Sequence, residues 1–389
     1  MSRKGTKIKR YGSIYGRNSG SLAIVMVMVV GLAIFGVAGW LLYTPIHDFI
    51  MSVGEEKPAA SESVPTQPKK EEPTAPDKQQ QTVVATKSEN MNAVYLPVSV
   101  IEDREAFSAS LEKAAAAGFN SVVIDAKDAS GSVLYLSNND VAKSSGVAAP
   151  NAYDAAAAAK AIKEKGLSPV VRLHAFRDAL APIAAREMAV HYYDTEVYWF
   201  DNAPELGGKP WLNPYSEKAQ NYILSLIEEL CAAGFETVLL DSVQFPSGVG
   251  LDKAGYGVNA ANTPKLQRLI TFTDKAKNQA LAKGAELILC SDGEWLAPGA
   301  EADNQKIYGE TPAKLFDDGV MLELSADSSS WDNRISQMKN SIGGDVWVVV
   351  PAYAEDGTLV ESDTLVKNIT AAKVENYLLF NPQGNYKYN

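Results

Sequence analysis

The residues of this sequence best suited to chemistry are acids that lie at the ends of short apolar runs. Asp241 lies in the run Thr237–Val243, and Glu294 follows the run that ends at Ser291. Two carboxyl groups held close together can cleave a glycosidic bond when one is protonated and the other ionised. The sequence therefore predicts Asp241 as nucleophile or base and Glu294 as general acid.

Other polar and aromatic side chains at the ends of apolar runs are candidates for binding a sugar. Charged groups can hydrogen-bond hydroxyls, and flat aromatic faces can cover the apolar face of a sugar ring. The predicted substrate-binding residues are Asp125, Lys127, Asp128, Arg172, His174, Trp211, Asn213, Asp292, Trp295, Glu323 and Tyr353.

Several of these residues also have a structural interpretation. An aspartate at a strand end often caps the next helix or hydrogen-bonds a loop. Arg172 lies within an apolar run, and a buried charge needs a partner, so a structural pair with Asp125 or Asp241 competes with a substrate contact. His174 can be a core histidine, and Trp211 can pack a loop.

The elements that must position these side chains are eight apolar runs separated by helical segments. Continuous apolar strands alternating with amphipathic helices indicate a parallel sheet covered on both faces. We therefore predict the α/β class, with a (β/α)8 TIM-type barrel over residues 91–389, whose active site forms at the carboxyl ends of its strands. The predicted strands are Ala93–Val98, Ser121–Ala126, Pro169–Ala175, Thr237–Val243, Glu286–Ser291, Val320–Leu324, Val346–Val350 and Tyr377–Phe380.

Two features bear on this barrel. No glycine-rich phosphate-binding motif follows the first run, which disfavours an open, doubly wound dinucleotide-binding sheet. Two stretches 116 residues apart also repeat one pattern: a helix ends at Gly118 or Gly234, a phenylalanine follows, and a strand leads to Asp125 or Asp241. A glycine suits the left-handed position at a helix end, so both stretches predict a helix-to-strand joint in the barrel wall.

The N-terminal part of the chain predicts a membrane anchor. Residues 1–20 contain six Lys and Arg and no acid, and residues 21–43 are 23 residues without a charge. A helix of that length spans a bilayer, and the basic flank is expected in the cytoplasm. A cleaved signal peptide is the alternative, although its apolar core would be shorter. Residues 44–90 are rich in Pro, Glu, Lys and Gln and predict an extended linker.

Composition argues against several other functions. The formal net charge is −11, and everything after the basic tail sums to −17, so nucleic-acid binding through phosphate contacts is not expected. The chain has two cysteines, Cys231 and Cys290, which we expect to be buried thiols, with a disulfide between them as the alternative for an exported domain. Three histidines are too few for a His-rich zinc hydrolase, although carboxylates alone can hold a cation, and we expect no metal or other cofactor. No Gly-x-Ser-x-Gly motif supports an α/β-hydrolase.

Five stretches resemble a bacterial family of glycosyl-hydrolase-like TIM-barrel domains. They are Val94–Pro97, Val122–Gly131, Val171–Asp178, Trp211–Tyr215 and Asp241–Pro246. The resemblance extends over about residues 93–381. It implies a barrel related to polysaccharide-cleaving enzymes, with Asp125, Lys127, Asp128, Arg172 and Asp241 in the pocket.

The chain departs from that family in two places. The family pattern Asp-Tyr-Val-Arg-Phe-Pro reads Asp-Ser-Val-Gln-Phe-Pro over residues 241–246, which removes an aromatic ring and a cation. The family's aromatic and histidine-bearing motif after the sixth strand is replaced by Leu322–Ser325. These departures are compatible with a different substrate or a lost activity.

Together these features predict a membrane-anchored extracellular glycoside hydrolase-like protein that acts on a cell-surface or cell-wall polysaccharide. The alternative is a non-catalytic barrel that binds a glycan or an envelope protein. Hydrolysis distinguishes the two.

Overall fold

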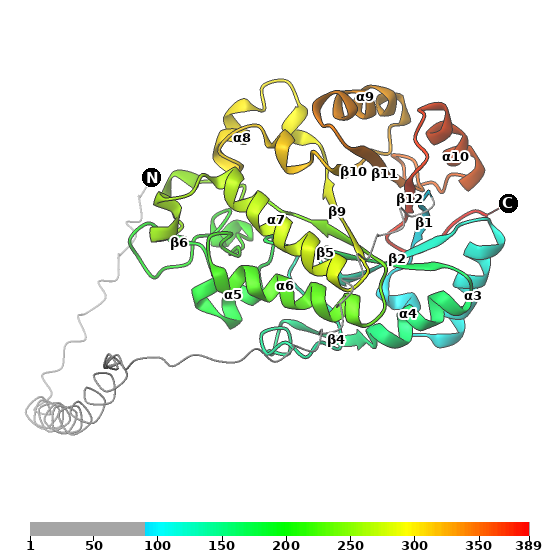
Figure 1. The fold of residues 1–389 in the computed structure, drawn as a ribbon, viewed down its shortest axis with the longest axis horizontal. Coiled ribbons are helices and arrows are strands. Elements are labelled where there is room, and N and C mark those ends of the chain that lie inside the picture. The colour runs from blue at the N-terminus through cyan, green and yellow to red at the C-terminus, as the bar shows by residue number, and fades with distance from the viewer. Residues whose placement is uncertain (1–89, 389) are drawn as a thin grey trace, which may run out of the picture. The chain divides into compact units, whose positions relative to one another are not determined.

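A closed barrel of eight parallel strands forms the centre of the computed structural model, which describes residues 90–388 (Figure 1). The first strand pairs with both the second and the last, which closes the sheet. This confirms the predicted (β/α)8 barrel for the described residues. In chain order around the barrel, the strands are β1 (Asn92–Tyr95), β2 (Ser121–Lys127), β5 (Ser168–His174), β7 (Thr237–Asp241), β9 (Glu286–Ser291), β10 (Gly319–Glu323), β11 (Asp345–Pro351) and β12 (Tyr377–Phe380).

All eight predicted strands are present, with small differences at their ends. The largest difference concerns β1, which ends at Tyr95 instead of Val98. Pro97 has no backbone N–H to donate to a neighbouring strand, and the short helix α2 (Val98–Ile101) begins directly after it.

Helices cover the outside of the barrel, as the apolar outer faces of its strands require (Figure 1). Aspartate or serine side chains cap several of them: Asp103 before α3, Asp154 before α4 and Ser216 before α6. The helices that follow α2 are α3 (Arg104–Ala116), α4 (Ala155–Glu164), α5 (Ala181–Ala184), α6 (Glu217–Ala232), α7 (Lys265–Ala282), α8 (Glu301–Ile307), α9 (Trp331–Ser341) and α10 (Ser362–Ala371).

The apolar core has two main parts because side chains of each strand point alternately inward and outward. The larger part fills the space between the strands and the outer helices. The smaller part lies inside the barrel and contains residues from every strand, among them Val123, Leu239, Met321 and Leu378. Cys290 belongs to this inner part, and both it and Cys231 are buried and free.

Two additions extend the barrel. Strands β3 (Val133–Tyr135) and β4 (Ala148–Tyr153) continue the sheet beyond β2. The loops after β5 and β7 form an extension in which β6 (His191–Tyr192) pairs with β8 (Ala254–Gly255) around the buried side chains of Trp199 and Trp211.

The residues after β12 pack against the start of the barrel. The hydroxyl of Tyr386 donates hydrogen bonds to the carbonyls of Tyr95 and Leu379, at 2.7 and 3.1 Å. The ring of Tyr388 meets Phe119 edge-on. This C-terminal segment therefore packs against β1, β12 and the residue that precedes β2 by two positions, Phe119.

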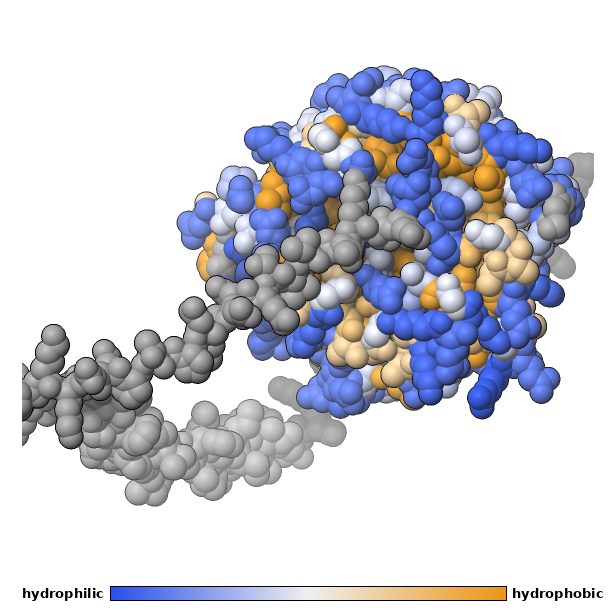
Figure 2. All heavy atoms as spheres, turned by 45° about the vertical axis from the view of Figure 1, so that its right-hand side comes forward, coloured by the Kyte–Doolittle hydropathy of each residue, from blue (hydrophilic) through white to orange (hydrophobic). Residues whose placement is uncertain are grey.

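Residues 90–388 contain no helix that is both long and apolar enough to span a bilayer. The predicted basic tail 1–20, the predicted span 21–43 and residues 44–89 of the predicted linker lie outside the described residues. Figure 2 shows polar residues spread over the visible face of the domain, with smaller apolar areas between them.

Candidate active site

The inward side chains change from apolar to charged toward the carboxyl ends of the strands. On β2, Val123 is followed two residues later by Asp125, and on β7, Leu239 is followed by Asp241. On β10, Met321 is followed by Glu323. We call the charged end of the barrel the mouth, defined by Asp125, Arg172, His174, Asp241 and Glu323.

One side of the mouth holds a closed ion pair. Arg172 Nε and Nη2 donate to the two carboxylate oxygens of Asp125, at 2.7 and 3.2 Å. The hydroxyl of Tyr95 donates to the same carboxylate at 2.8 Å. The guanidinium lies over the rings of Tyr95 and Phe380, with its central carbon 5.4 and 5.1 Å from their centroids. The sequence left open whether Arg172 pairs with Asp125, pairs with Asp241 or contacts substrate, and the structure contains the pair with Asp125.

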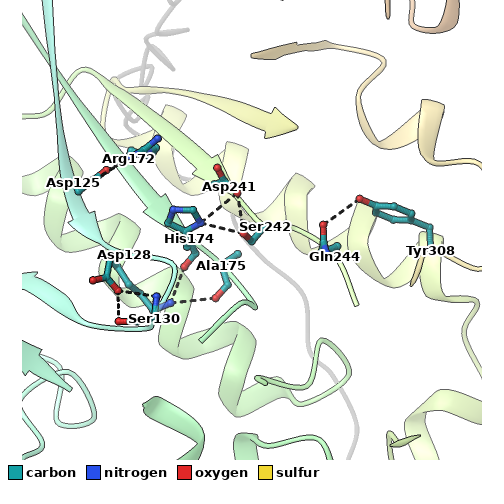
Figure 3. A network of polar contacts seen from close by, with 11 residues as sticks. Asp125, Asp128, Ser130, Arg172, His174, Ala175, Asp241, Ser242, Gln244 and Tyr308 are labelled. Carbon is teal, nitrogen blue, oxygen red and sulfur yellow. Dashed lines mark hydrogen bonds and ion pairs between the residues drawn. The ribbon is translucent and has the colours of Figure 1, made fainter. Parts of the chain in front are cut away.

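Next to this pair, Asp241 forms a second network with His174 and Ser242 (Figure 3). The register of β5 and β7 places His174 beside Asp241. Asp241 Oδ1 accepts a hydrogen bond from Ser242 Oγ at 2.8 Å and lies 3.3 Å from His174 Nδ1. His174 Nδ1 is also 3.0 Å from Ser242 Oγ. The three groups therefore meet at one carboxylate oxygen.

The two acids of the mouth have pKa values shifted in opposite directions. Burial alone would raise the pKa of Asp241, but His174, Arg172 and the Ser242 hydroxyl stabilise its ionised form and hold the pKa well below its ordinary value. Burial and the charge of Asp241 raise the pKa of Glu323 to about 7, against the opposing effects of Arg172 and His174. Near neutral pH, the mouth thus combines an ionised carboxylate with a carboxyl group that can hold a proton.

Lys127 and Asp128, both predicted to bind substrate, hold the backbone around the mouth. Lys127 and Asp178 form an ion pair of 3.0 Å, and neither side chain is exposed. Lys127 Nζ also donates to the carbonyl of His174 at 2.8 Å. Asp128 Oδ1 closes its own loop by accepting from the backbone N–H groups of Ser130 and Ser132. Gly131 is required here, because a Cβ would lie 2.0 Å from Asp178 Oδ1.

Glu294, the predicted general acid, is not part of the network around Asp241. It lies in a turn after β9, its side chain is 72% exposed, and it forms a 3.9 Å ion pair with Arg334. Asp292 accepts a hydrogen bond from the backbone N–H of Glu294 and closes that turn. Trp295 is buried and stacks on Phe316, with ring centroids 5.6 Å apart.

The remaining candidates lie elsewhere on the loops. Trp211 is buried in the extension, where its Nε1 donates to Asp201 at 2.9 Å. Asn213 is buried too, and its side-chain oxygen accepts from the backbone N–H of Tyr215. Tyr353 is partly exposed in the loop after β11, where it bridges to Leu359.

The sequence prediction missed Tyr95 and Ser242, which hydrogen-bond the acids of the mouth, and it missed the acid role of Glu323. The two-residue alternation that selects Asp241 would also have selected Tyr95, whereas the acid role of Glu323 depends on burial and on the charge of Asp241, which spacing does not show. The departure from the family pattern at position 242 was the one sequence signal for Ser242, but it did not indicate a hydrogen bond to Asp241. Between residues 90 and 388, no group of three or more His, Cys, Asp or Glu side chains is arranged to hold a metal ion.

A family model described as "Putative glycosyl hydrolase domain" matches residues 93–288. No curated protein matches the chain in sequence. The galactosidase domain of an α-galactosidase–sucrose kinase superposes with a TM-score of 0.50 and 11% identity, over 76% of this chain and 38% of that one. It shares the barrel fold.

Two further solved structures are similar at lower TM-scores. The α-galactosidase from Lactobacillus brevis has a TM-score of 0.49 and 10% identity, over 76% of this chain and 38% of that one. A hypothetical protein from Ruminiclostridium thermocellum has 0.44 and 22%, over 50% of this chain and 96% of that one. This chain therefore spans less than half the length of the two galactosidase structures.

Proposed function

Because this chain belongs to the "Putative glycosyl hydrolase domain" family, we propose that it hydrolyses glycosidic bonds in a cell-surface or cell-wall polysaccharide. The observation that carries the proposal is the pair of acids in one mouth, Asp241 with a lowered pKa and Glu323 with a pKa of about 7. Glycoside cleavage needs this division of roles between two carboxyl groups.

In the proposed reaction, Glu323 gives its proton to the glycosidic oxygen as the bond to the anomeric carbon breaks. Asp241 either attacks that carbon or removes a proton from the water that attacks it. In the first case, water later cleaves the glycosyl–enzyme bond and returns a proton to Glu323. In the second case, the sugar is released directly, and proton exchange with solvent restores both acids.

We assign the acid role to Glu323 instead of Glu294 because of their surroundings. An acid that donates at neutral pH needs a raised pKa, which burial and a neighbouring anion provide at Glu323. Glu294 is exposed and lies beside a cation, Arg334. Removing both acid candidates in turn tests the assignment directly.

We further propose that residues 21–43 anchor the chain in the cell membrane, with residues 1–20 in the cytoplasm and the barrel outside. The support is the uncharged 23-residue run behind six basic residues. Protease added to intact cells should then remove the barrel, and carbonate washing should leave the full chain in the membrane fraction. A barrel that is protected in intact cells, or a chain that washes off, would contradict this topology.

The enzymatic test uses the full chain in mild detergent with a panel of cell-wall and surface glycans. New reducing ends should appear with the wild type and should be lost with Asp241→Asn. The alternative function, a barrel that only binds a glycan or an envelope protein, predicts binding without new reducing ends on every glycan. That outcome would replace the hydrolase proposal.

A further inference from the structure

We propose that Ser242 and His174 are positioning residues that fix Oδ1 of Asp241 and leave Oδ2 as the oxygen that reacts. This inference rests on the glycosidase function proposed above. It goes further by naming the reacting atom and the two side chains that select it.

The two oxygens of Asp241 have different surroundings. Oδ1 is 2.8 Å from Ser242 Oγ and 3.3 Å from His174 Nδ1. Among the described residues, no group donates a hydrogen bond to Oδ2. The Asp241 side chain is 16% exposed, so it is mostly shielded from water but not closed off. An oxygen without a protein donor keeps its lone pairs for a substrate carbon or a water molecule.

The short contacts also determine where the protons lie. Ser242 donates its only hydroxyl hydrogen to Asp241 Oδ1, so its oxygen can only accept from His174 Nδ1. Nδ1 without a hydrogen would face two acceptors, the Ser242 oxygen and the Asp241 carboxylate. His174 must therefore carry a hydrogen on Nδ1, and in the neutral ring Nε2 is left as an acceptor.

The backbone of Ser242 supports a special role for its hydroxyl. Its φ is +56°, a left-handed value that is uncommon for residues other than glycine. The carbonyl groups of Asp241 and Ser242 accept from the N–H groups of Ala175 and Phe176, at 2.7 and 3.2 Å, so the turn is tied to the residues after β5. Glycine would adopt this turn without strain, but it would supply no hydroxyl.

His174 is held at both ends. Its ring meets Ser242, and its carbonyl accepts from Lys127, whose charge is balanced by the buried Asp178. The buried ion pair below the mouth thus fixes the strand end from which His174 projects. This second layer keeps the ring in place when substrate enters.

Removing the Ser242 hydroxyl should change the titration of Asp241. The charged groups that act on Asp241 are His174 and Arg172 on β5, and Asp241 in turn acts on Glu323 on β10, on Cys290 of β9 and on Tyr308. A donor stabilises the ionised carboxylate, so its loss raises the pKa of Asp241. The acid limb of the kcat/KM profile, which reports this ionisation, should then move to higher pH.

The first experiment compares Ser242→Gly with Ser242→Thr in the full chain. Ser242→Gly should fold at least as stably as wild type, yet lose about 10- to 100-fold in kcat with little change in KM, and its acid limb should move to higher pH. Ser242→Thr keeps the hydroxyl, so it should recover most of the kcat and the wild-type acid limb, although its β-branch adds strain at this φ and should lower the melting temperature. A serine that only shapes the turn predicts the reverse order, with glycine fully active, and this result would overturn the proposal.

The second experiment needs no activity. Nitrogen NMR of the imidazoles at pH 8 should show a hydrogen on Nδ1 of His174, and His174→Asn assigns its signal among the three histidines of the chain. Ser242→Gly should shift that signal. Nδ1 without a hydrogen, or no shift in Ser242→Gly, would overturn the network. A wild type that cleaves no glycan would instead remove the proposed function and the reacting oxygen, while the NMR result still decides the hydrogen bonds.

Discussion

Asp125 and Asp241 lie at equivalent places in two similar stretches, yet the barrel gives them different chemistry. Each lies at or near the end of a Val-rich or Leu-rich strand that follows a helix, a glycine and a phenylalanine. Asp125 has both oxygens engaged, by Arg172 and by Tyr95. Asp241 has one oxygen engaged, by Ser242 and His174.

The difference comes from neighbouring strands and not from the local sequence. Asp125 is paired in register with Arg172, whereas Asp241 is paired with His174. A fixed cation that binds both oxygens makes a carboxylate structural, since nothing is left to react. A carboxylate with one free oxygen beside a protonated acid is equipped for catalysis.

The largest expected effect is on catalysis at Asp241. Asp241→Asn keeps the shape of the side chain and an oxygen for Ser242, but it removes the negative charge. We expect kcat/KM to fall by about 10⁴-fold with little change in the melting temperature. Reducing-end assays and thermal unfolding of the same sample measure both. A variant that unfolds instead would make Asp241 as structural as Asp125 and end the comparison.

Glu323→Gln tests whether Glu323 is the proton donor that works with Asp241. With the proton donor gone, kcat/KM should fall by about 10²- to 10⁴-fold for poor leaving groups, and the basic limb near pH 7 should disappear. Glu294→Gln is the matched control, because Glu294 is an exposed glutamate in the turn after the neighbouring strand, β9. Equal losses in both variants, or a loss only in Glu294→Gln, would return the acid role to Glu294.

Asp125→Ala tests whether the ion pair between Asp125 and Arg172 stabilises the fold. It leaves the guanidinium of Arg172, whose side chain is only 12% exposed, without its carboxylate. We expect a loss of about 3–5 kcal/mol in the free energy of unfolding, measured with denaturant. Combining it with Arg172→Met should restore much of that loss, because an apolar side chain needs no partner. Full stability of Asp125→Ala alone would contradict a structural pair.

The smallest effect concerns pH and stability. The pKa of Glu323 is about 7 in the folded protein against 4.5 for an ordinary glutamate, so the unfolded chain releases this proton first as the pH rises. Stability is therefore unaffected below pH 4.5 and falls as the pH rises toward 7. Glu323→Gln should be more stable than wild type by about 1–3 kcal/mol at pH 8.5 and equal to it at pH 4, by denaturant unfolding. A constant difference at both pH values would mean that Glu323 has an ordinary pKa.

Most of the fold could be predicted from the sequence. Short continuous apolar runs that alternate with amphipathic helices indicate strands buried on both faces, and this alternation permits few topologies. β9 and β12 were predicted to the residue. β1 was extended too far, because its apolar run continues to Val98 while Pro97 ends the strand pairing.

The site was less predictable. Asp125, Arg172, His174, Asp241 and Glu323 were named as candidates because they lie in or near the carboxyl ends of strands, and the barrel brings them to one mouth. Lys127 ends a strand but pairs with the buried Asp178, and Trp211 lies in a loop but hydrogen-bonds Asp201 within the extension. Glu323 is the last residue of its strand and lies in the mouth. Glu294 follows its strand by three residues, in a turn that exposes its side chain to solvent.

The amino-acid sequence determined which segments are strands and which acids stand at their ends, because apolar periodicity and proline act locally. Tertiary structure decided which acid is paired, which is free and which holds a proton. Those properties depend on charges from strands far apart in the chain, and at Asp241 they depend on His174 and Ser242 meeting one oxygen across two neighbouring strands.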